Sequence, residues 1–155
     1  MELFRIIQDE FANDLSGNGA RLFGGRWNSE GVFALYTSFT RSMALLETLA
    51  HTPANLLNIK IYQLVTLSVP DNELAAVILL SDLPVGWDVP DTRPLTKRLG
   101  DKFLRDKTSL LLSVPCVQMP EEINYVINPL HPDMGKVKIS HKRRIYFDSR
   151  ISEHL

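Results

Sequence analysis

The sequence predicts a single domain of the α+β class. Three observations lead to this class: the chain length, the balance of residue types, and the order of strand-like and helix-like segments. A chain of 155 residues can bury one substantial core but is too short for two ordinary domains. Hydrophobic residues make up 45% and charged residues 23% of the chain, a balance that is typical of a folded protein. Strand-like segments outnumber helical ones, and no repeat or change in composition divides residues 1–155.

The first forty residues predict two strands joined by a long loop. Residues 3–7 (LFRII) have the composition of a short strand, and residues 32–37 (VFALYT) combine aromatic and β-branched side chains. The segment between them, residues 14–31, holds five of the eight glycines and therefore predicts a loop. Bulky side chains such as Trp27 indicate that this loop is ordered, and an ordered loop of this length often carries function.

A helix and the clearest strand of the sequence follow. Hydroxyl side chains that can cap a helix precede a helical segment over Thr40–His51, which Pro53 ends. Residues 58–69 (NIKIYQLVTLSV) are rich in apolar and β-branched side chains up to Pro70, so we expect a strand at the centre of the sheet.

The second half of the chain predicts a loop, a helix and several strands. Pro84–Pro94 is rich in proline and predicts a loop, and apolar residues recur at helical spacing over Leu95–Lys107. The expected strands that follow are Ser109–Val114, Ile123–Ile127 and Ile145–Phe147, with Val137–Ile139 pairing beside them.

Charge and cysteine content exclude several classes of function. The formal net charge of −1 supplies no field to hold DNA or RNA, so direct nucleic-acid binding is not expected. A single cysteine, Cys116, excludes an intramolecular disulfide and a CxxC zinc site, which fits the cytoplasm. No leader-like segment is evident and residues 74–80 are too short to cross a bilayer, so no membrane contact is expected. The histidines are too scattered to predict a metal site: His51, His131, His141 and His154.

Glu47 is the most unusual charged residue of the first predicted helix. It shares one helix face with Met43, Leu46 and Ala50, because these positions differ by three or four residues. A carboxylate on an apolar stripe is costly to bury unless a cation holds it or it faces a cleft. On spacing alone, the sequence favours a helix-edge Glu47 paired with an arginine over a functional role.

Three further side chains could contact a nucleotide. In GGRWN, two glycines allow a ligand to approach the backbone of Arg26, whose guanidinium can bind phosphate oxygens in a bidentate way. The alternative is an ordinary turn with a structural arginine. Tyr36 could stack on an aromatic base or fill the core, and Arg5 within an apolar strand must reach a partner or solvent.

Two other features have simpler interpretations. The basic run HKRR, residues 141–144, precedes a predicted strand and is best explained as a solvated edge that discourages strand pairing. Cys116 follows Pro115 without an identifiable partner for nucleophilic catalysis, so a small buried residue is the default expectation.

Taken together, these segments resemble the RES domain, which is named for its Arg, Glu and Ser residues and is the toxin half of bacterial RES–Xre toxin–antitoxin pairs. The resemblance spans nearly the whole chain. It begins at Arg5, includes GGRWNSEGVFALYTS and SMALLETLAH, and continues through LTKRLGDKFL, SVPCVQMPEEINYVINPLHPD and IYFDSRI. The resemblance implies a split, strongly bent β core with packed helices, similar to ADP-ribosyltransferases, and an enzyme that cleaves NAD⁺ with water (NAD⁺ glycohydrolase) or phosphate (NAD⁺ phosphorylase).

The same resemblance implies a role for each candidate residue. Arg5 and Arg26 would contact the phosphates of NAD⁺, Tyr36 would hold the nicotinamide end, and Glu47 would stabilise the reacting ribose. Cys116 stands where the family has a serine, and because a thiol is a weak donor and acceptor we expect reduced activity. NAD⁺ is thus the expected substrate, with phosphate as a second substrate in the phosphorylase case.

The resemblance also implies binding partners, and two alternative functions stay open. The implied partner is an Xre-type helix-turn-helix antitoxin that covers the cleft, and a homodimer is a further expectation. One alternative is an ADP-ribosyltransferase that modifies a macromolecule. Another is an NAD⁺-binding protein whose turnover is weakened by Cys116.

Overall fold

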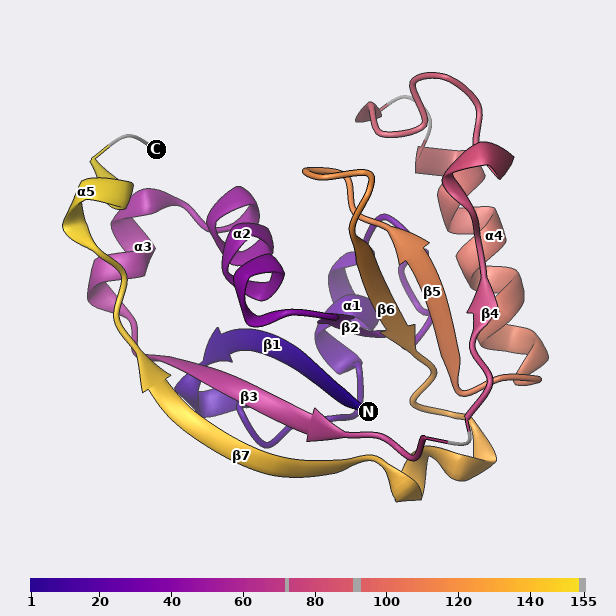
Figure 1. The fold of residues 1–155 in the computed structure, drawn as a ribbon, viewed down its shortest axis with the longest axis horizontal. Coiled ribbons are helices and arrows are strands. Elements are labelled where there is room, and N and C mark those ends of the chain that lie inside the picture. Colours follow the sequence, from indigo (N-terminus) through magenta and orange to yellow (C-terminus); the bar gives the residue numbers. More distant parts are fainter. Residues whose placement is uncertain (72, 91–92, 154–155) are drawn as a thin grey trace.

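The computed structural model describes residues 1–71, 73–90 and 93–153 (Figure 1). Within these residues, seven strands form one sheet in the order β4-β5-β6-β2-β1-β3-β7. All neighbouring strands are antiparallel except β4 and β5, which are parallel. The strands are β1 (Glu2–Gln8), β2 (Leu35–Ser38), β3 (Tyr62–Ser68), β4 (Ala76–Val77), β5 (Leu111–Pro115), β6 (Ile123–Ile127) and β7 (Lys138–Ile145).

The two longest of the described helices lie on one face of this sheet. The first is α2 (Arg41–His51), which begins where the Thr40 hydroxyl accepts a hydrogen bond from the Met43 amide at 3.1 Å. The second is α4 (Arg93–Asp106). The short helices are α1 (Asn18–Phe23), α3 (Ala54–Ile59) and α5 (Ser149–Ser152), with 3-10 turns at η1 (Asp9–Phe11), η2 (Leu80–Asp82) and η4 (Pro132–Lys136).

The sheet is strongly bent, so that one of its faces folds onto itself. In Figure 1, β1, β3 and β7 run across the view while β5 and β6 run steeply, and β2 joins the two halves. Leu3 and Leu67 from one half belong to the same buried cluster as Leu111 and Ile127 from the other half. This cluster is the main core, and its burial is the principal source of stability for the bend.

The opposite face of the sheet carries α2 and α4. Ala44 of α2 packs on Phe4 and Leu64. Phe103 of α4 belongs to another buried cluster, together with Leu112, Val114 and Val126 of β5 and β6. The helices therefore cover different halves of this face, and the candidate site described below lies on the same face.

Several expectations from the sequence are confirmed. The α+β class and the bent core are observed, the strand Ile123–Ile127 has the predicted bounds, and Thr40 caps the helix that ends at His51. The helix expected over Leu95–Lys107 is α4, which begins two residues earlier and ends one residue earlier.

Other expectations are wrong in part. Residues 14–31 are not all loop, because α1 forms within them, and the strand expected over residues 32–37 is Leu35–Ser38. The strand expected over residues 58–69 begins only at Tyr62, because α3 extends to Ile59. It is also not central, since β3 has only β7 between itself and the edge of the sheet.

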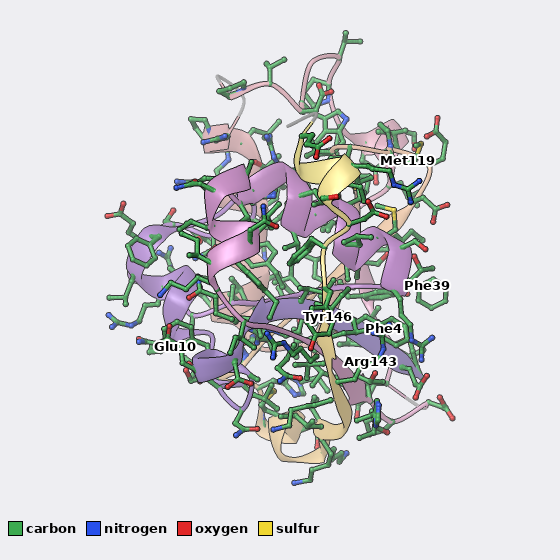
Figure 2. All side chains as sticks on the ribbon, turned by 90° about the vertical axis from the view of Figure 1, so that its left-hand side faces the viewer. Phe4, Glu10, Phe39, Met119, Arg143 and Tyr146 are labelled. Atoms are coloured by element: carbon green, nitrogen blue, oxygen red, sulfur yellow. The ribbon has the colours of Figure 1, made fainter. Side chains whose placement is uncertain are left out.

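The C-terminal strand prediction also needs correction. Val137–Ile139 and Ile145–Phe147 are not two strands, because one strand, β7, runs through Lys138–Ile145 and includes the basic run. This strand forms the sheet edge, and Figure 2 shows Arg143 and Tyr146 along its exposed side. Residues 91–92 of the predicted proline-rich loop, and His154, lie outside the described residues.

Candidate active site

The carboxylate of Glu47 is held by one residue of β6 and one that directly follows β5. Glu47 lies on α2 with 27% of its side chain exposed. Its Oε1 atom accepts a hydrogen bond from Asn124 Nδ2 at 2.6 Å and contacts the sulfur of Cys116 at 3.3 Å. The 2.6 Å bond is short, as expected for a charge-assisted interaction with a carboxylate. Glu47 is therefore oriented by the sheet beneath it.

The pairing of β5 with β6 explains why these two donors lie together. Asn124 is paired with Val114 in the antiparallel register, and the Cys116 amide donates to the Glu122 carbonyl at 3.0 Å. The end of β5 and the start of β6 are consequently neighbours, under the face of α2 that carries Glu47. The sulfur of Cys116 also contacts Gln118 Oε1 at 3.1 Å.

Burial determines the protonation of Cys116. The residue is completely buried, and this burial raises the pKa of its thiol, with the nearby Glu47 carboxylate adding to the effect. Cys116 is therefore a neutral thiol near pH 7. It can act as a weak hydrogen-bond donor to Glu47 but not as a thiolate nucleophile.

Arg26 reaches across the chain to the segment before α4. Its guanidinium donates to the carbonyl oxygens of Trp87 at 3.1 Å and Asp88 at 2.8 Å, and it lies 6.0 Å from the Trp87 ring centroid. Burial and the nearby Arg93 lower the pKa of Arg26, while the carboxylates of Asp88 and Glu47 act in the opposite direction. The carbonyl oxygens of Trp87 and Asp88 therefore fix the Arg26 guanidinium.

Tyr36 holds the GGRWN segment in place. Its hydroxyl donates to Asn28 Oδ1 at 2.8 Å and accepts from the Trp27 amide at 2.9 Å. A Cβ atom at Gly25 would lie 2.6 Å from the same hydroxyl, so the second glycine of the motif is required by close approach. Burial raises the pKa of Tyr36, so the hydroxyl stays neutral and available for both bonds.

The same segment is anchored on its other side by α4. Asp101, which is 7% exposed, accepts hydrogen bonds from the Ser29 amide at 2.8 Å and the Ser29 hydroxyl at 2.6 Å. Gly100 lies directly against the backbone of Trp27, with no room for a side chain. Arg26 is consequently placed by a segment fixed to both β2 and α4.

The structure brings together four of the five candidate residues and separates the fifth. Glu47 and Cys116 contact each other. Tyr36, which holds the segment of Arg26, leaves the sheet on the same face as Asn124, because Tyr36 pairs with Val126, two residues after Asn124. Arg5 leaves β1 on the face that carries Leu3 and Ile7, whereas α2 covers the opposite face, on which Phe4 lies.

Arg5 has a structural environment of its own. Its guanidinium donates to the Asp14 carbonyl at 3.1 Å, and burial lowers its pKa to about 10 against the smaller opposing influence of the Asp14 charge. The contact of Arg5 with NAD⁺ phosphates stays a prediction that this position does not support, because the alternation of side chains along β1 directs Arg5 to the face opposite Glu47.

Sequence inspection missed three parts of this site. Asn124 was not singled out, although a polar residue between apolar neighbours in INYVI is a signal that it faces a polar partner. The carbonyls of Trp87 and Asp88 carry no sequence signal, because backbone acceptors are present at every residue. Asp101 lies in a helix of mixed polar and apolar residues, and the sequence of that helix does not indicate that Asp101 is buried.

The assembled groups suit the stabilisation of charge in an organic substrate. A fixed carboxylate can stabilise positive charge that develops on a sugar, and a guanidinium with unused N–H groups can bind phosphate oxygens. Within residues 1–71, 73–90 and 93–153, no three His, Cys, Asp or Glu side chains gather as a metal site would require. No helix in the same residues is long and apolar enough to span a membrane.

Comparison with known sequences identifies relatives over almost the whole chain. The profile of the RES domain matches residues 2–148. A protein named Prs ADP-ribosylating toxin from Sphingobium sp. (strain YBL2) is 40% identical over 142 residues, which cover 90% of this chain and 88% of that protein. A protein named Toxin Res from Photorhabdus laumondii subsp. laumondii is 31% identical over 154 residues, covering 97% of both chains.

Comparison with solved structures supports the fold. A chain in the crystal structure of the M. tuberculosis MbcT–MbcA toxin–antitoxin complex superposes with a TM-score of 0.78. The match covers 99% of this chain and 87% of that chain at 18% sequence identity. At this identity the similarity shows a shared fold.

Proposed function

This chain belongs to the RES-domain family, and from that premise we propose that it is the toxin of a toxin–antitoxin pair that cleaves the nicotinamide–ribose bond of NAD⁺. The observation that carries the proposal is that Asn124, which holds Glu47, and Tyr36, which holds the segment of Arg26, leave the sheet on the same face. Residues 21 positions apart in the sequence thus provide an anionic group for the ribose and a cationic group for the phosphates.

Glu47 is proposed to act on the sugar. When the nicotinamide–ribose bond breaks, its electron pair moves to the ring nitrogen, and nicotinamide leaves as a neutral base. The ribose then carries oxocarbenium character, which a carboxylate close to the sugar stabilises. Asn124 and Cys116 both contact Oε1 of Glu47, so Oε2 is the oxygen proposed to stabilise the ribose.

Arg26 is proposed to orient the diphosphate of NAD⁺. A guanidinium has five N–H groups, and the bonds to the carbonyls of Trp87 and Asp88 hold it from one side. Its remaining N–H groups can bind phosphate oxygens, and its fixed position lowers the entropy cost of aligning the substrate. Tyr36 acts at the nicotinamide end through its ring, because its hydroxyl is already bonded to the loop.

Water or phosphate is the proposed acceptor of the sugar. Attack by water gives ADP-ribose, and attack by phosphate gives its 1-phosphate, with the proton of the nucleophile released in either case. The guanidinium of Arg26 would also favour approach of an anionic phosphate. Both reactions deplete free NAD⁺, which accounts for toxicity without a macromolecular target.

A second candidate function is transfer of ADP-ribose to a macromolecule. It is favoured by the relative that is 40% identical, whose name describes an ADP-ribosylating toxin. Both candidates share the cleavage step and the role of Glu47, and they differ only in the nucleophile.

The cleavage step is tested by nicotinamide release from NAD⁺. The wild type should release nicotinamide, and Glu47→Gln should slow release by at least about 100-fold, since the charge that stabilises the ribose is removed. Glu10→Gln is the matched control, because Glu10 is exposed and lies in η1, away from α2 (Figure 2). Equal rates for wild type and Glu47→Gln would refute the proposed mechanism.

The acceptor is identified from the products. Reactions with and without phosphate separate phosphorolysis from hydrolysis by the sugar product. Labelled NAD⁺ in a cell extract tests the second candidate, for which the label should enter a macromolecule and no free sugar product should form.

The proposed partner is an Xre-type helix-turn-helix antitoxin that covers the candidate site, with the toxin acting in the cytoplasm. Support comes from the family and from the solved relative, which lies in a toxin–antitoxin complex. Co-expression with the neighbouring gene should yield a complex that lacks nicotinamide release. Mass measurement of the partner-free chain tests the expected homodimer, for which the mass should be twice that of one chain.

A further inference from the structure

We infer that Asn124 is the positioning residue of the candidate site, which fixes the Glu47 carboxylate so that only one of its oxygens is free for the ribose. The inference rests on the proposed NAD⁺ cleavage and deepens it. Asn124 itself need not touch the substrate.

The backbone of Asn124 is unusually well fixed for this task. It lies in β6, between Ser38 of β2 and Val114 of β5, so strands flank it on both sides. Its side chain leaves the sheet on the face covered by α2, and it meets Glu47 from a position 77 residues further along the chain. The distance of 2.6 Å joins a rigid donor to a carboxylate on a helix.

Among the residues that the structure describes, Glu47 is the hydrogen-bond partner that orients the amide of Asn124. Its Nδ2 atom donates to Glu47, while its Oδ1 atom is buried and has no hydrogen-bond partner among the described residues. A buried acceptor without a partner is unfavourable, and a flipped amide would turn Oδ1 against the carboxylate. Oδ1 of Asn124 therefore stays without a partner while Nδ2 donates to Glu47.

The two oxygens of Glu47 are consequently different. Oε1 receives the Asn124 amide and the weaker Cys116 thiol. Oε2 lies 3.5 Å from His51 Nδ1, but that nitrogen is closer to the Glu47 carbonyl oxygen, at 2.9 Å. A carboxylate without Asn124 would rotate about its last bond and spend less time in the productive orientation.

The inference predicts a specific pattern of kinetics. Asn124→Ala should lower kcat for nicotinamide release by about 100-fold with little change in KM, because substrate binding does not use Asn124. In a Glu47→Gln background the same substitution should change kcat by less than about twofold, since Asn124 acts only through Glu47. An equal loss in both backgrounds would overturn the inference in favour of a merely structural role.

A matched control lies just beyond the opposite end of the same strand. Asn128 follows β6, is 1% exposed and donates to the Leu104 carbonyl at 2.9 Å, away from Glu47. Asn128→Ala should lower stability but leave kcat of the folded fraction unchanged. A comparable loss of kcat in this control would show that any lost asparagine in this region perturbs the site.

A structural readout separates failure of this inference from failure of the proposed function. Crystal structures of the wild type and Asn124→Ala should show the Glu47 carboxylate ordered in the first and rotated or in several orientations in the second. An unchanged carboxylate would overturn the positioning role. A wild type that releases no nicotinamide would instead refute the proposed function, and the crystal comparison would still decide the role of Asn124.

Discussion

Gly100 of α4 lies against the carbonyl of Trp27 so closely that a Cβ atom at position 100 would be 1.8 Å from the carbonyl oxygen. The obstacle is backbone and cannot move aside as a flexible side chain could. Gly100→Ala must therefore push α4 away from the segment that carries Arg26. We expect a loss of at least about 2 kcal/mol in the free energy of unfolding, measured by denaturant titration, together with slower nicotinamide release.

The control for this substitution is another glycine in a helix. Gly19 lies in α1, and a Cβ atom there meets nothing within 4 Å. Gly19→Ala should leave stability unchanged or raise it slightly, because alanine loses less backbone entropy in a helix. If both alanine variants were equally stable, direct contact between α4 and the Trp27 backbone would not be present in solution.

Tyr36→Phe tests whether the GGRWN segment depends on a single hydroxyl. The substitution removes the acceptor of the Trp27 amide and the donor to Asn28, whose side chain is completely buried. We expect the free energy of unfolding to fall by about 1–3 kcal/mol, since two polar groups lose a partner. We also expect KM for NAD⁺ to rise, as Arg26 loses its fixed position.

The comparison for Tyr36→Phe is Tyr146→Phe. Tyr146 is 74% exposed beside the sheet edge, so its hydroxyl can bond to water in either state (Figure 2). This variant should match the wild type in denaturant midpoint and in KM. A Tyr36→Phe protein with wild-type values for both quantities would show that the loop is held by other contacts.

The elements that the sequence predicts well are those whose signals are local. Thr40 and Pro53 mark the two ends of α2 through capping and through the missing amide of proline, and both act within a few residues. The strand Ile123–Ile127 combines β-branched and aromatic residues and has turns on both sides. For β7 the sequence predicts two short strands instead of one, because β7 is an exposed edge strand whose run HKRR has no apolar alternation.

The candidate site is less accessible to sequence analysis because its contacts are long-range. Family resemblance directed attention to Arg26 and Glu47, but the bonds that place them join residues 61 to 77 positions apart. No local pattern indicates that Asn124 lies beneath Glu47. Arg5 shows a second effect, because a strand residue can match a family pattern and still leave the sheet on the face opposite α2.

Cys116→Ser restores the residue type that the family resemblance implies at this position. A hydroxyl donates a stronger hydrogen bond to a carboxylate than a thiol does, and the sulfur lies 3.3 Å from Glu47 Oε1. We expect NAD⁺ turnover to rise by about fivefold, which corresponds to about 1 kcal/mol. Nicotinamide release at saturating NAD⁺ measures this change. An unchanged rate would remove Cys116 from the site and leave Asn124 as the donor that orients Glu47.

The raised pKa of Cys116 makes a separate prediction about its reactivity. Burial and the adjacent Glu47 carboxylate disfavour the thiolate, so the thiol is protonated below its pKa and ionises only at more alkaline pH than an ordinary cysteine. Alkylation by iodoacetamide, followed by mass spectrometry, should be slow at pH 7 and should accelerate with pH above about 8.5, the ordinary cysteine pKa. In Glu47→Gln, the loss of the neighbouring charge should shift this acceleration to lower pH. Fast alkylation of the wild type at pH 7 would mean that Cys116 is an exposed or activated thiolate, and it could not then donate a hydrogen bond to Glu47.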